Sequence, residues 1–294
     1  MTILFHAKNN WAMIAKQKFG STLYLVIAIL IGWILAVWLF KNNFAIQLLI
    51  SLLIACGIYV LFLIQKKKWD KAVQEQVDFY NLKTSLQQSS LDPHFLFNAL
   101  NSVSFSIHKD SRDDAASNLS TFSKFMRISL NNIDKFGHDL NEEMEFIKNY
   151  LILEKFRFKE QFDYTIRVQP YVNDMNNVPV FSAFCFVENA LKKGVLTRQG
   201  GGKIDIEVDE NPAEKELIIR IMDNGAYRDL TKKENFTHNI MVVNALIDRL
   251  NSANQRKIKI DYSANKNEFG DVEGCKVEMR IPTELSYKLT PATI

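Results

Sequence analysis

Two long apolar runs near the start of the chain dominate its hydrophobic pattern. Residues 23–40 form an 18-residue run without a charge, and residues 44–64 form a 21-residue run without one. At about 1.5 Å of rise per residue, a helix over either run approaches the roughly 30 Å thickness of a bilayer core. Because only residues 41–43 separate the runs, the pattern predicts a two-helix transmembrane hairpin over residues 23–64. A cleaved signal peptide fits the first run poorly, since no small-x-small cleavage site lies near its end. A buried soluble helix is the alternative for the second run.

Lysines flank the two runs unevenly. Three precede the first run, one lies between the runs and four follow the second, in the order Lys8, Lys16, Lys18, Lys41, Lys66, Lys67, Lys68 and Lys71. The positive-inside rule then places both termini in the cytoplasm and predicts a multi-pass protein with the lipid bilayer as a partner. Residues 1–22 become a cytoplasmic N-terminal segment, and almost no sequence is left for an external ligand-binding domain. The net charge of +3 is too small to indicate direct nucleic-acid binding, and three widely separated cysteines give no zinc or redox motif.

A polar, helix-favouring stretch follows the second run, over about residues 65–90. Its apolar spacing favours a weak dimeric coiled coil, and an ordinary amphipathic helix fits equally well. The Asp-Pro pair at 92–93 is typical of a helix start, and helices are predicted from there to about 107 and over about 111–135. Two such hairpins in a homodimer would form a four-helix bundle. Residues 65–139 are therefore interpreted as a coiled-coil linker and dimerisation domain.

The pattern changes to alternating strands after a predicted helix over Leu140–Phe158. Five segments alternate apolar and polar residues like half-buried strands, namely 164–168, 203–208, 217–221, 257–261 and 275–281. Helical stretches are expected at about 180–193 and 239–252. The pattern predicts an α/β sandwich, a mixed sheet with helices on one face, over residues 140–294. The chain is thus expected to be multi-domain.

His94 and Asn98 are the first candidate chemical groups. They lie four residues apart in Pro-His-Phe-Leu-Phe-Asn, so they share one face of the predicted helix. An exposed imidazole is a competent nucleophile near neutral pH, and an amide one turn away can orient it. A structural histidine on an amphipathic helix is the alternative.

Two further strings indicate a phosphate-binding pocket. In Phe-Val-Glu-Asn-Ala-Leu-Lys-Lys-Gly, the residues Glu188, Asn189 and Lys192 lie within about one helical turn. An amide oxygen can hold Mg²⁺ beside phosphates and a lysine can meet their charge, although an ordinary helix end with a glycine cap fits as well. In the other string a predicted strand ends in Asp223-Asn-Gly225. The carboxylate can accept a hydrogen bond from an adenine amino group, and Gly225 lets the backbone pass close to the base; alone, this string is a turn signal.

The order of these motifs behind a membrane hairpin resembles one family. Residues 80–285 are similar to membrane sensor histidine kinases of the LytS/YehU type, most specifically in Pro-His-Phe-Leu-Phe-Asn followed by Ala-Leu-Asn. The family's Tyr-Leu-x-x-Glu-x-x-Arg-Phe helix is also matched, by Tyr150, Glu154, Arg157 and Phe158.

The resemblance implies an ATP-dependent protein-histidine kinase of a two-component system. By this resemblance His94 would be the autophosphorylated phospho-acceptor, Asn189 would hold Mg²⁺ with the ATP phosphates, Lys192 would meet those phosphates, and Asp223 would bind adenine. The phosphoryl group would pass to an aspartate of a cytoplasmic response regulator, which in this family often carries a LytTR-type DNA-binding domain.

The sequence departs from the family pattern around the pocket. Tyr227 stands where a second glycine is usual, residues 238–250 hold none of the family's lid glycines, and Lys193 replaces a common histidine. Because glycines let backbone N–H groups approach phosphates, a pseudokinase or membrane scaffold that docks a regulator or partner kinase is the alternative function. Lys193 could still supply charge to bound phosphates. The general base is left open between Asp92 and Glu188.

Overall fold

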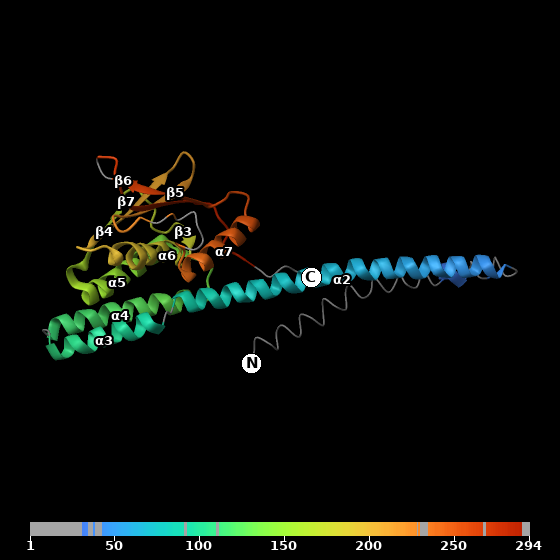
Figure 1. Ribbon diagram of the computed structural model, residues 1–294, viewed down its shortest axis with the longest axis horizontal. Helices are drawn as coiled ribbons and strands as arrows, with labels where there is room; N and C mark the ends of the chain where they lie inside the picture. Colours follow the sequence, from blue (N-terminus) through green and yellow to red (C-terminus); the bar gives the residue numbers. More distant parts are fainter. Residues whose placement is uncertain are drawn as a thin grey trace. The chain divides into compact units, whose positions relative to one another are not determined.

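The chain divides into two compact units, Met1–Phe79 with Thr290–Ile294, and Tyr80–Leu289 (Figure 1). The computed structural model describes residues 31–34, 38, 43–90, 93–109, 112–227, 229, 235–266 and 269–289. Within these ranges the side chains of 87–90, 105–109, 112 and 160 lie outside the description.

One long helix, α2, runs from Phe44 to Ser90 and holds the second apolar run. Its stretch Phe44–Leu86 is long and apolar enough to cross a membrane, and none of its most apolar window is buried in the protein. Large side chains such as those of Leu52 and Phe62 are exposed. This exposure argues against a buried soluble helix and fits a helix that faces lipid.

The first predicted span is described only at residues 31–34 and Trp38, which are helical. Trp33 Nε1 donates a hydrogen bond of 2.9 Å to Ser51 Oγ of α2. This contact joins the two apolar segments. Most of the first run and its connection through residues 39–42 lie outside the described residues, so the transmembrane hairpin stays a prediction.

The second unit contains a helical hairpin that packs beside a further helix. Helix α3 spans Pro93–Lys109 and α4 spans Arg112–Asn132, close to the predicted positions. Pro93 is the first residue of α3, where its missing N–H leaves no helical hydrogen bond unmade. Helix α5 spans Leu140–Phe158, which confirms the prediction, and α3, α4 and α5 lie side by side (Figure 1).

A five-stranded mixed sheet follows, in the order β2-β4-β5-β7-β6. Its strands are β2 (Phe162–Val168), β4 (Gly202–Asn211), β5 (Glu216–Asp223), β6 (Lys259–Lys266) and β7 (Val272–Pro282). Strand β2 pairs with β4 in parallel and the other neighbours pair antiparallel, which confirms the predicted mixed sheet. Two short strands that the sequence does not predict, β1 (Gly137–Asp139) and β3 (Asn177–Pro179), pair antiparallel in a separate sheet.

Helices cover one face of the five-stranded sheet (Figure 1). Besides α5 and its 3-10 turn η1 (Lys159–Gln161), these are α6 (Ser182–Asn189), the π-helical turn η2 (Ala190–Gly194), the 3-10 turn η3 (Val195–Thr197) and α7 (His238–Ala253). Along β4, Ile204 and Ile206 are fully buried, while Asp205 and Glu207 between and after them are partly exposed. The two-residue period that predicts the strands therefore separates an apolar, helix-covered face from a polar, open face.

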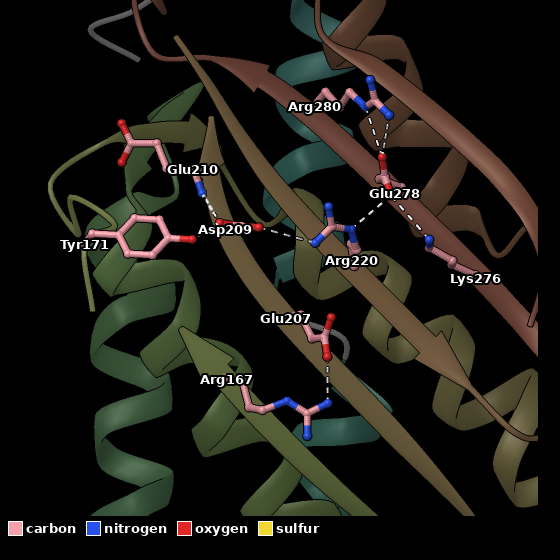
Figure 2. A network of polar contacts seen from close by, with 9 residues as sticks. All are labelled: Arg167, Tyr171, Glu207, Asp209, Glu210, Arg220, Lys276, Glu278 and Arg280. Carbon is pink, nitrogen blue, oxygen red and sulfur yellow. Dashed lines mark hydrogen bonds and ion pairs between the residues drawn. The ribbon is translucent and has the colours of Figure 1, made fainter. Parts of the chain in front are cut away.

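The open face carries a row of charged side chains that are aligned across the strands (Figure 2). Arg167 lies opposite Glu207, Glu207 opposite Arg220, and Arg220 opposite Glu278. Arg167 donates a hydrogen bond of 2.6 Å to Glu207, and Arg220 donates one of 3.0 Å to Glu278. Burial opposes ionisation of Glu278, but hydrogen bonds from Arg280, Arg220 and a lysine outweigh it and lower its pKa to about 2.

A chain of aromatic rings joins the helical hairpin to the sandwich within the second unit. The ring centroid of Phe95 in α3 lies 5.0 Å from that of Phe125 in α4 and 5.1 Å from that of Tyr150 in α5. Phe125 stacks on Phe146 at 4.4 Å, and Phe146 lies 4.8 Å from Phe184 of α6. Helices α3 and α6, which carry different candidate motifs, therefore both pack on α5.

Candidate functional site

His94 lies in the first turn of α3, and its side chain is exposed. The amide nitrogen of Asn98, one turn later, lies 3.1 Å from Nε2 and 3.3 Å from Nδ1 of the imidazole. The next residue, Phe95, is 6% exposed and anchors the helix, whereas Phe97 is 68% exposed. The helix thus holds His94 outward with Asn98 beside its ring, as the spacing of the two residues predicts.

The end of α6 gathers Glu188, Asn189 and Lys192. The carboxylate of Glu188 is 4% exposed, and it accepts hydrogen bonds from Lys192 Nζ at 2.7 Å and from the amide of Asn239 in α7 at 2.5 Å. The side chain of Asn189 is 1% exposed, and its Oδ1 has no hydrogen-bond partner among the described residues. A buried carbonyl oxygen without a partner is costly. This oxygen therefore keeps its capacity to accept a hydrogen bond or to ligate a cation.

The helix widens into a π-helical turn directly after Asn189. Short π-helical turns occur frequently at functional sites. Lys193 in this turn is exposed, and Lys192 is partly exposed. Both lysines can therefore reach an anion from the solvent side without losing their place in the helix.

Asp223 ends strand β5 and is 3% exposed. Its Oδ1 accepts a hydrogen bond of 3.0 Å from the backbone N–H of Gly225. A Cβ on Gly225 would lie 2.2 Å from the carbonyl carbon of Gly194, so this glycine is required for the close approach of the two backbones. The strings that contain Asn189 and Asp223 are therefore brought together at Gly194 and Gly225.

Gly274 of β7 is a site residue that the sequence interpretation missed. It has a φ of +90°, and a Cβ there would lie 2.2 Å from the backbone oxygen of Asp223. Strand β7 thus passes directly beside the Asp223 backbone. A glycine inside a strand signals close backbone approach, but the predicted strand begins at residue 275, so this signal appears only with the observed bounds of β7.

Glu154 of α5 is a second buried acid beside this site. It is 2% exposed, and the nearest guanidinium nitrogen of Arg157 lies 3.6 Å from Oε2. Burial raises the pKa of Glu154, and the charges of Arg157 and Lys192 partly oppose that rise. The nearby charge of Glu188 raises it further. Lys192 therefore stands near two carboxylates, one on α5 and one on α6.

Glu143 of α5 positions the start of α6. Its fully buried carboxylate accepts backbone hydrogen bonds from Phe181 at 3.0 Å and Phe184 at 2.9 Å, and it is also hydrogen-bonded to His138 Nε2. These bonds satisfy N–H groups that a helix start leaves without helical partners. The helix that carries Asn189 is thus tied to α5 by a side chain from a distant part of the sequence.

Comparison with known proteins identifies what this chain is similar to. Residues 82–162, which hold His94 and α5, match the family model described as Histidine kinase. The chain is similar to the Sensor histidine kinase/phosphatase LytS of Staphylococcus aureus strains Mu50 and N315, with 33% identity over 138 residues in each case. These residues are 47% of this chain and 23% of LytS, so the match spans about a quarter of the relative's length. The resemblance to LytS-type sensor histidine kinases is thereby confirmed.

Similarity to solved structures is lower. The histidine kinase domain from the Erythrobacter litoralis EL346 blue-light activated histidine kinase has 13% sequence identity and a TM-score of 0.37, covering 73% of this chain and 94% of that one. The catalytic domain of histidine kinase ThkA has 16% identity and a TM-score of 0.36, covering 51% of this chain and 97% of that one. The candidate nucleotide residues Glu188, Asn189 and Asp223 lie beyond the family match, which ends at residue 162.

Proposed function

We propose that the chain is an ATP-dependent protein-histidine kinase of a two-component system, which phosphorylates its own His94 and passes the phosphoryl group to an aspartate of a response regulator. The family match over residues 82–162 and the likeness to LytS support the class. The observation that carries the proposal is the buried Oδ1 of Asn189, which has no partner among the described residues and lies in the helix that approaches Asp223.

The donor set around α6 fits Mg²⁺ and the phosphates of ATP. The amide oxygen of Asn189 is a hard ligand of the kind that Mg²⁺ takes alongside phosphate oxygens and water. Lys192 would exchange its ion pair with Glu188 for the phosphates, and Lys193 would add charge from the solvent side. Asp223 would accept a hydrogen bond from the adenine amino group, while Gly225 keeps the backbone close enough for the base to approach. Bound Mg²⁺ would supply neutralisation of phosphate charge.

His94 is the proposed nucleophile. Its exposure lets a second domain or a second subunit reach it, and Asn98 would hold the imidazole so that one ring nitrogen faces the incoming phosphoryl group. Glu188 is kept as the candidate base. Because Lys192 and Asn239 occupy its two oxygens, it would be available only after Lys192 turns to the phosphates.

The remaining assignments follow from the same proposal. The chain would be a homodimer in the bacterial inner membrane with both termini in the cytoplasm, anchored by the hairpin 23–64 and paired through the dimerisation domain 65–139. The exposed apolar part of α2 supports the bilayer contact. The regulator would be cytoplasmic and of the LytTR type that the family resemblance implies, and we expect no direct contact of the chain with nucleic acid. The ATP-binding domain is proposed over 140–294. Its first helix, α5, also packs on the hairpin through the ring contacts of Phe146 and Tyr150.

A pseudokinase is the second candidate, and one observation favours it. Helix α7 begins at His238, and Ile240 and Val243 in its first turns are buried in the core. Residues 226–269 contain no glycine. Backbone N–H groups held in a packed helix cannot turn toward phosphates as a glycine loop can. In this case the chain would dock a regulator or a partner kinase through the helical hairpin.

Mg²⁺-ATP binding by calorimetry distinguishes the two candidates. The full chain in detergent is the right sample, because a cut at residue 140 would expose the faces of Phe146 and Tyr150 that pack against the hairpin. We expect binding that is lost in Asp223→Ala and kept in Asp261→Ala, which removes an exposed aspartate from β6. Absence of binding by folded protein at millimolar ATP would establish the pseudokinase.

A phosphorylation assay then tests the acceptor. With ATP and Mg²⁺, the chain should gain an acid-labile phosphoryl label that His94→Ala abolishes and His108→Ala, on the same helix, retains. Asn189→Asp should also abolish the label without dissociating the dimer. A label that persists in His94→Ala would remove this residue from the mechanism.

A further inference from the structure

Two adjoining hollows lie on either side of the turn that ends α5. The first has a volume of about 750 Å³ and the second about 610 Å³. Arg157 and Lys159 line both of them. The two hollows therefore form one groove that is divided by this pair of cations, and neither belongs to the Asn189–Asp223 site.

The first hollow has one wall of amides and one of cations. Its polar lining comprises Asn98, Asn101, Ser102 and Asn118 from the hairpin, Lys155, Arg157 and Lys159 from the end of α5, and Tyr164 of β2. No carboxylate is among the described residues that line it. Three cations and three amides in this lining offer donors for an anion.

The second hollow continues the same character toward the nucleotide motifs. Arg198 joins Arg157 and Lys159 in its lining, and Gly200 and Gly201 form part of its wall with φ values of +89° and +84°. Arg198 also donates a hydrogen bond to the backbone oxygen of Asn224, the residue after Asp223. The groove thus extends from Asn98, whose amide lies beside the ring of His94, to Arg198, which bonds to the residue after Asp223.

The cation at the centre of the groove is held there at a conformational cost. Lys159 has φ 50° and ψ −120°, a backbone conformation that favours glycine. Lys155 and Arg157 are engaged with Asp163 and Glu154, but Lys159 has no ion pair among the described residues. Because the Lys159 side chain is exposed, its ammonium group is available to an anion in the groove.

We propose that this groove binds a small multivalent anion of the phosphate class, such as a phosphorylated metabolite, at a site separate from the nucleotide pocket. The anion would be held by Lys159, Arg157 and the amides of the hairpin wall. Because Asn98 lines the groove and its amide lies against the ring of His94, occupancy would change how the imidazole is held. The binding itself requires no kinase activity, so it can fail or succeed independently of the proposed function.

Pyrophosphate is the probe, titrated by calorimetry into the full chain in detergent at constant ionic strength. Lys159→Gly removes the charge and suits the positive φ, so folding is preserved. We expect this variant to bind pyrophosphate at least about tenfold more weakly, because a charge-assisted hydrogen bond is lost. Lys159→Arg keeps the charge and should bind like the wild type. Equal affinity in Lys159→Gly and the wild type would overturn the proposal, as would absence of binding in the wild type.

A second pair of measurements identifies the site and the chemistry. Lys192→Gln removes the lysine of the nucleotide motif and should change pyrophosphate affinity by no more than about twofold, as expected for a charge screened by solvent. Loss of binding in Lys192→Gln would place the anion in the nucleotide pocket and refute a separate site. Citrate is the carboxylate comparison, and tight binding of citrate with none of pyrophosphate would refute the phosphate class.

Discussion

The two faces of the five-stranded sheet hold polar side chains in opposite ways. On the open face, Arg167, Glu207, Arg220 and Glu278 stand in one row and bond with their neighbours across the strands (Figure 2). On the helical side five polar groups are each less than 5% exposed, namely Glu143, Glu154, Glu188, Asn189 and Asp223. On the open face, the polar side chains therefore form ion pairs that are in contact with water. On the covered side, the polar side chains are buried.

This difference indicates which polar side chains need a functional explanation. An exposed ion pair contributes only about 0–1 kcal/mol, so a row of them needs no role beyond solubility and register. A buried polar group costs more unless it is bonded, so each one needs a reason. Glu143 has its reason within the fold, since it bonds to three groups. The oxygen of Asn189 has no partner among the described residues, and in the proposed function its partner is Mg²⁺.

The largest expected effect on stability comes from Phe146, an apolar side chain in the core on the covered side of the sheet. Phe146→Ala should lower the free energy of unfolding of the second unit by about 3–5 kcal/mol, because its ring contacts both the hairpin and α6. Phe146→Leu should cost less than about 1.5 kcal/mol. Pulse proteolysis in urea suits this measurement, since all four tryptophans lie before residue 70 and do not report on this unit. Equal stability of the alanine variant and the wild type would mean that hairpin and sandwich are not packed as described.

The next effect tests whether a buried acid on the covered side is structural. Glu143→Ala leaves the Phe181 and Phe184 N–H groups and the His138 ring without their acceptor, and should cost about 3 kcal/mol in the same assay. The matched control is Glu142→Gln, since the contacts of the Glu142 carboxylate among the described residues are ion pairs of 3.8–3.9 Å. It should change stability by less than about 0.5 kcal/mol. A comparable loss in both variants would remove the distinction between Glu143 and its neighbour.

A third comparison separates two reasons for a glycine, a positive φ and the close approach of another backbone segment. Gly274 and Gly270 have φ values of +90° and +87°, but a Cβ at Gly274 would lie 2.2 Å from the Asp223 backbone, whereas at Gly270 it would meet nothing within 4 Å. Gly270→Ala should cost about 1 kcal/mol through strain alone, and Gly274→Ala about 2 kcal/mol or more. Only Gly274→Ala should also weaken ATP binding, read by calorimetry. Equal behaviour of the two variants in both measurements would argue against the role of Gly274 beside Asp223.

The periodic parts of the fold could be predicted from the sequence, because their signals are local. The hydrophobic pattern predicts the helix Leu140–Phe158 at its observed bounds. The alternation of apolar and polar residues in strands such as β4 is sufficient to predict a mixed sheet. Short strands β1 and β3 were missed because three residues carry no period.

Contacts between distant residues could not be predicted. Nothing in the sequence around Glu143 shows that its carboxylate meets the start of α6. The same holds for Lys192, whose partner Glu188 is visible from helical spacing while the nearby charge of Glu154 is not. The residues of the candidate site were found by motif, and the buried groups that hold them in place were found only from the fold.

The smallest expected effect concerns the open face and depends on pH. Because the pKa of Glu278 is lowered to about 2 from a usual value of 4.5, its ionised form stabilises the fold above pH 4.5, and this contribution is lost as the pH falls toward 2. With solvent screening, Glu278→Gln should cost about 1 kcal/mol at pH 7. The difference between variant and wild type should be constant from pH 7 to 5 and shrink steadily below that, as read by urea unfolding with circular dichroism detection. A difference in stability that grows as the pH falls would mean that Glu278 is protonated in the folded protein. The open face would then resemble the covered side, because its carboxyl group would be present for a reason other than ion pairing.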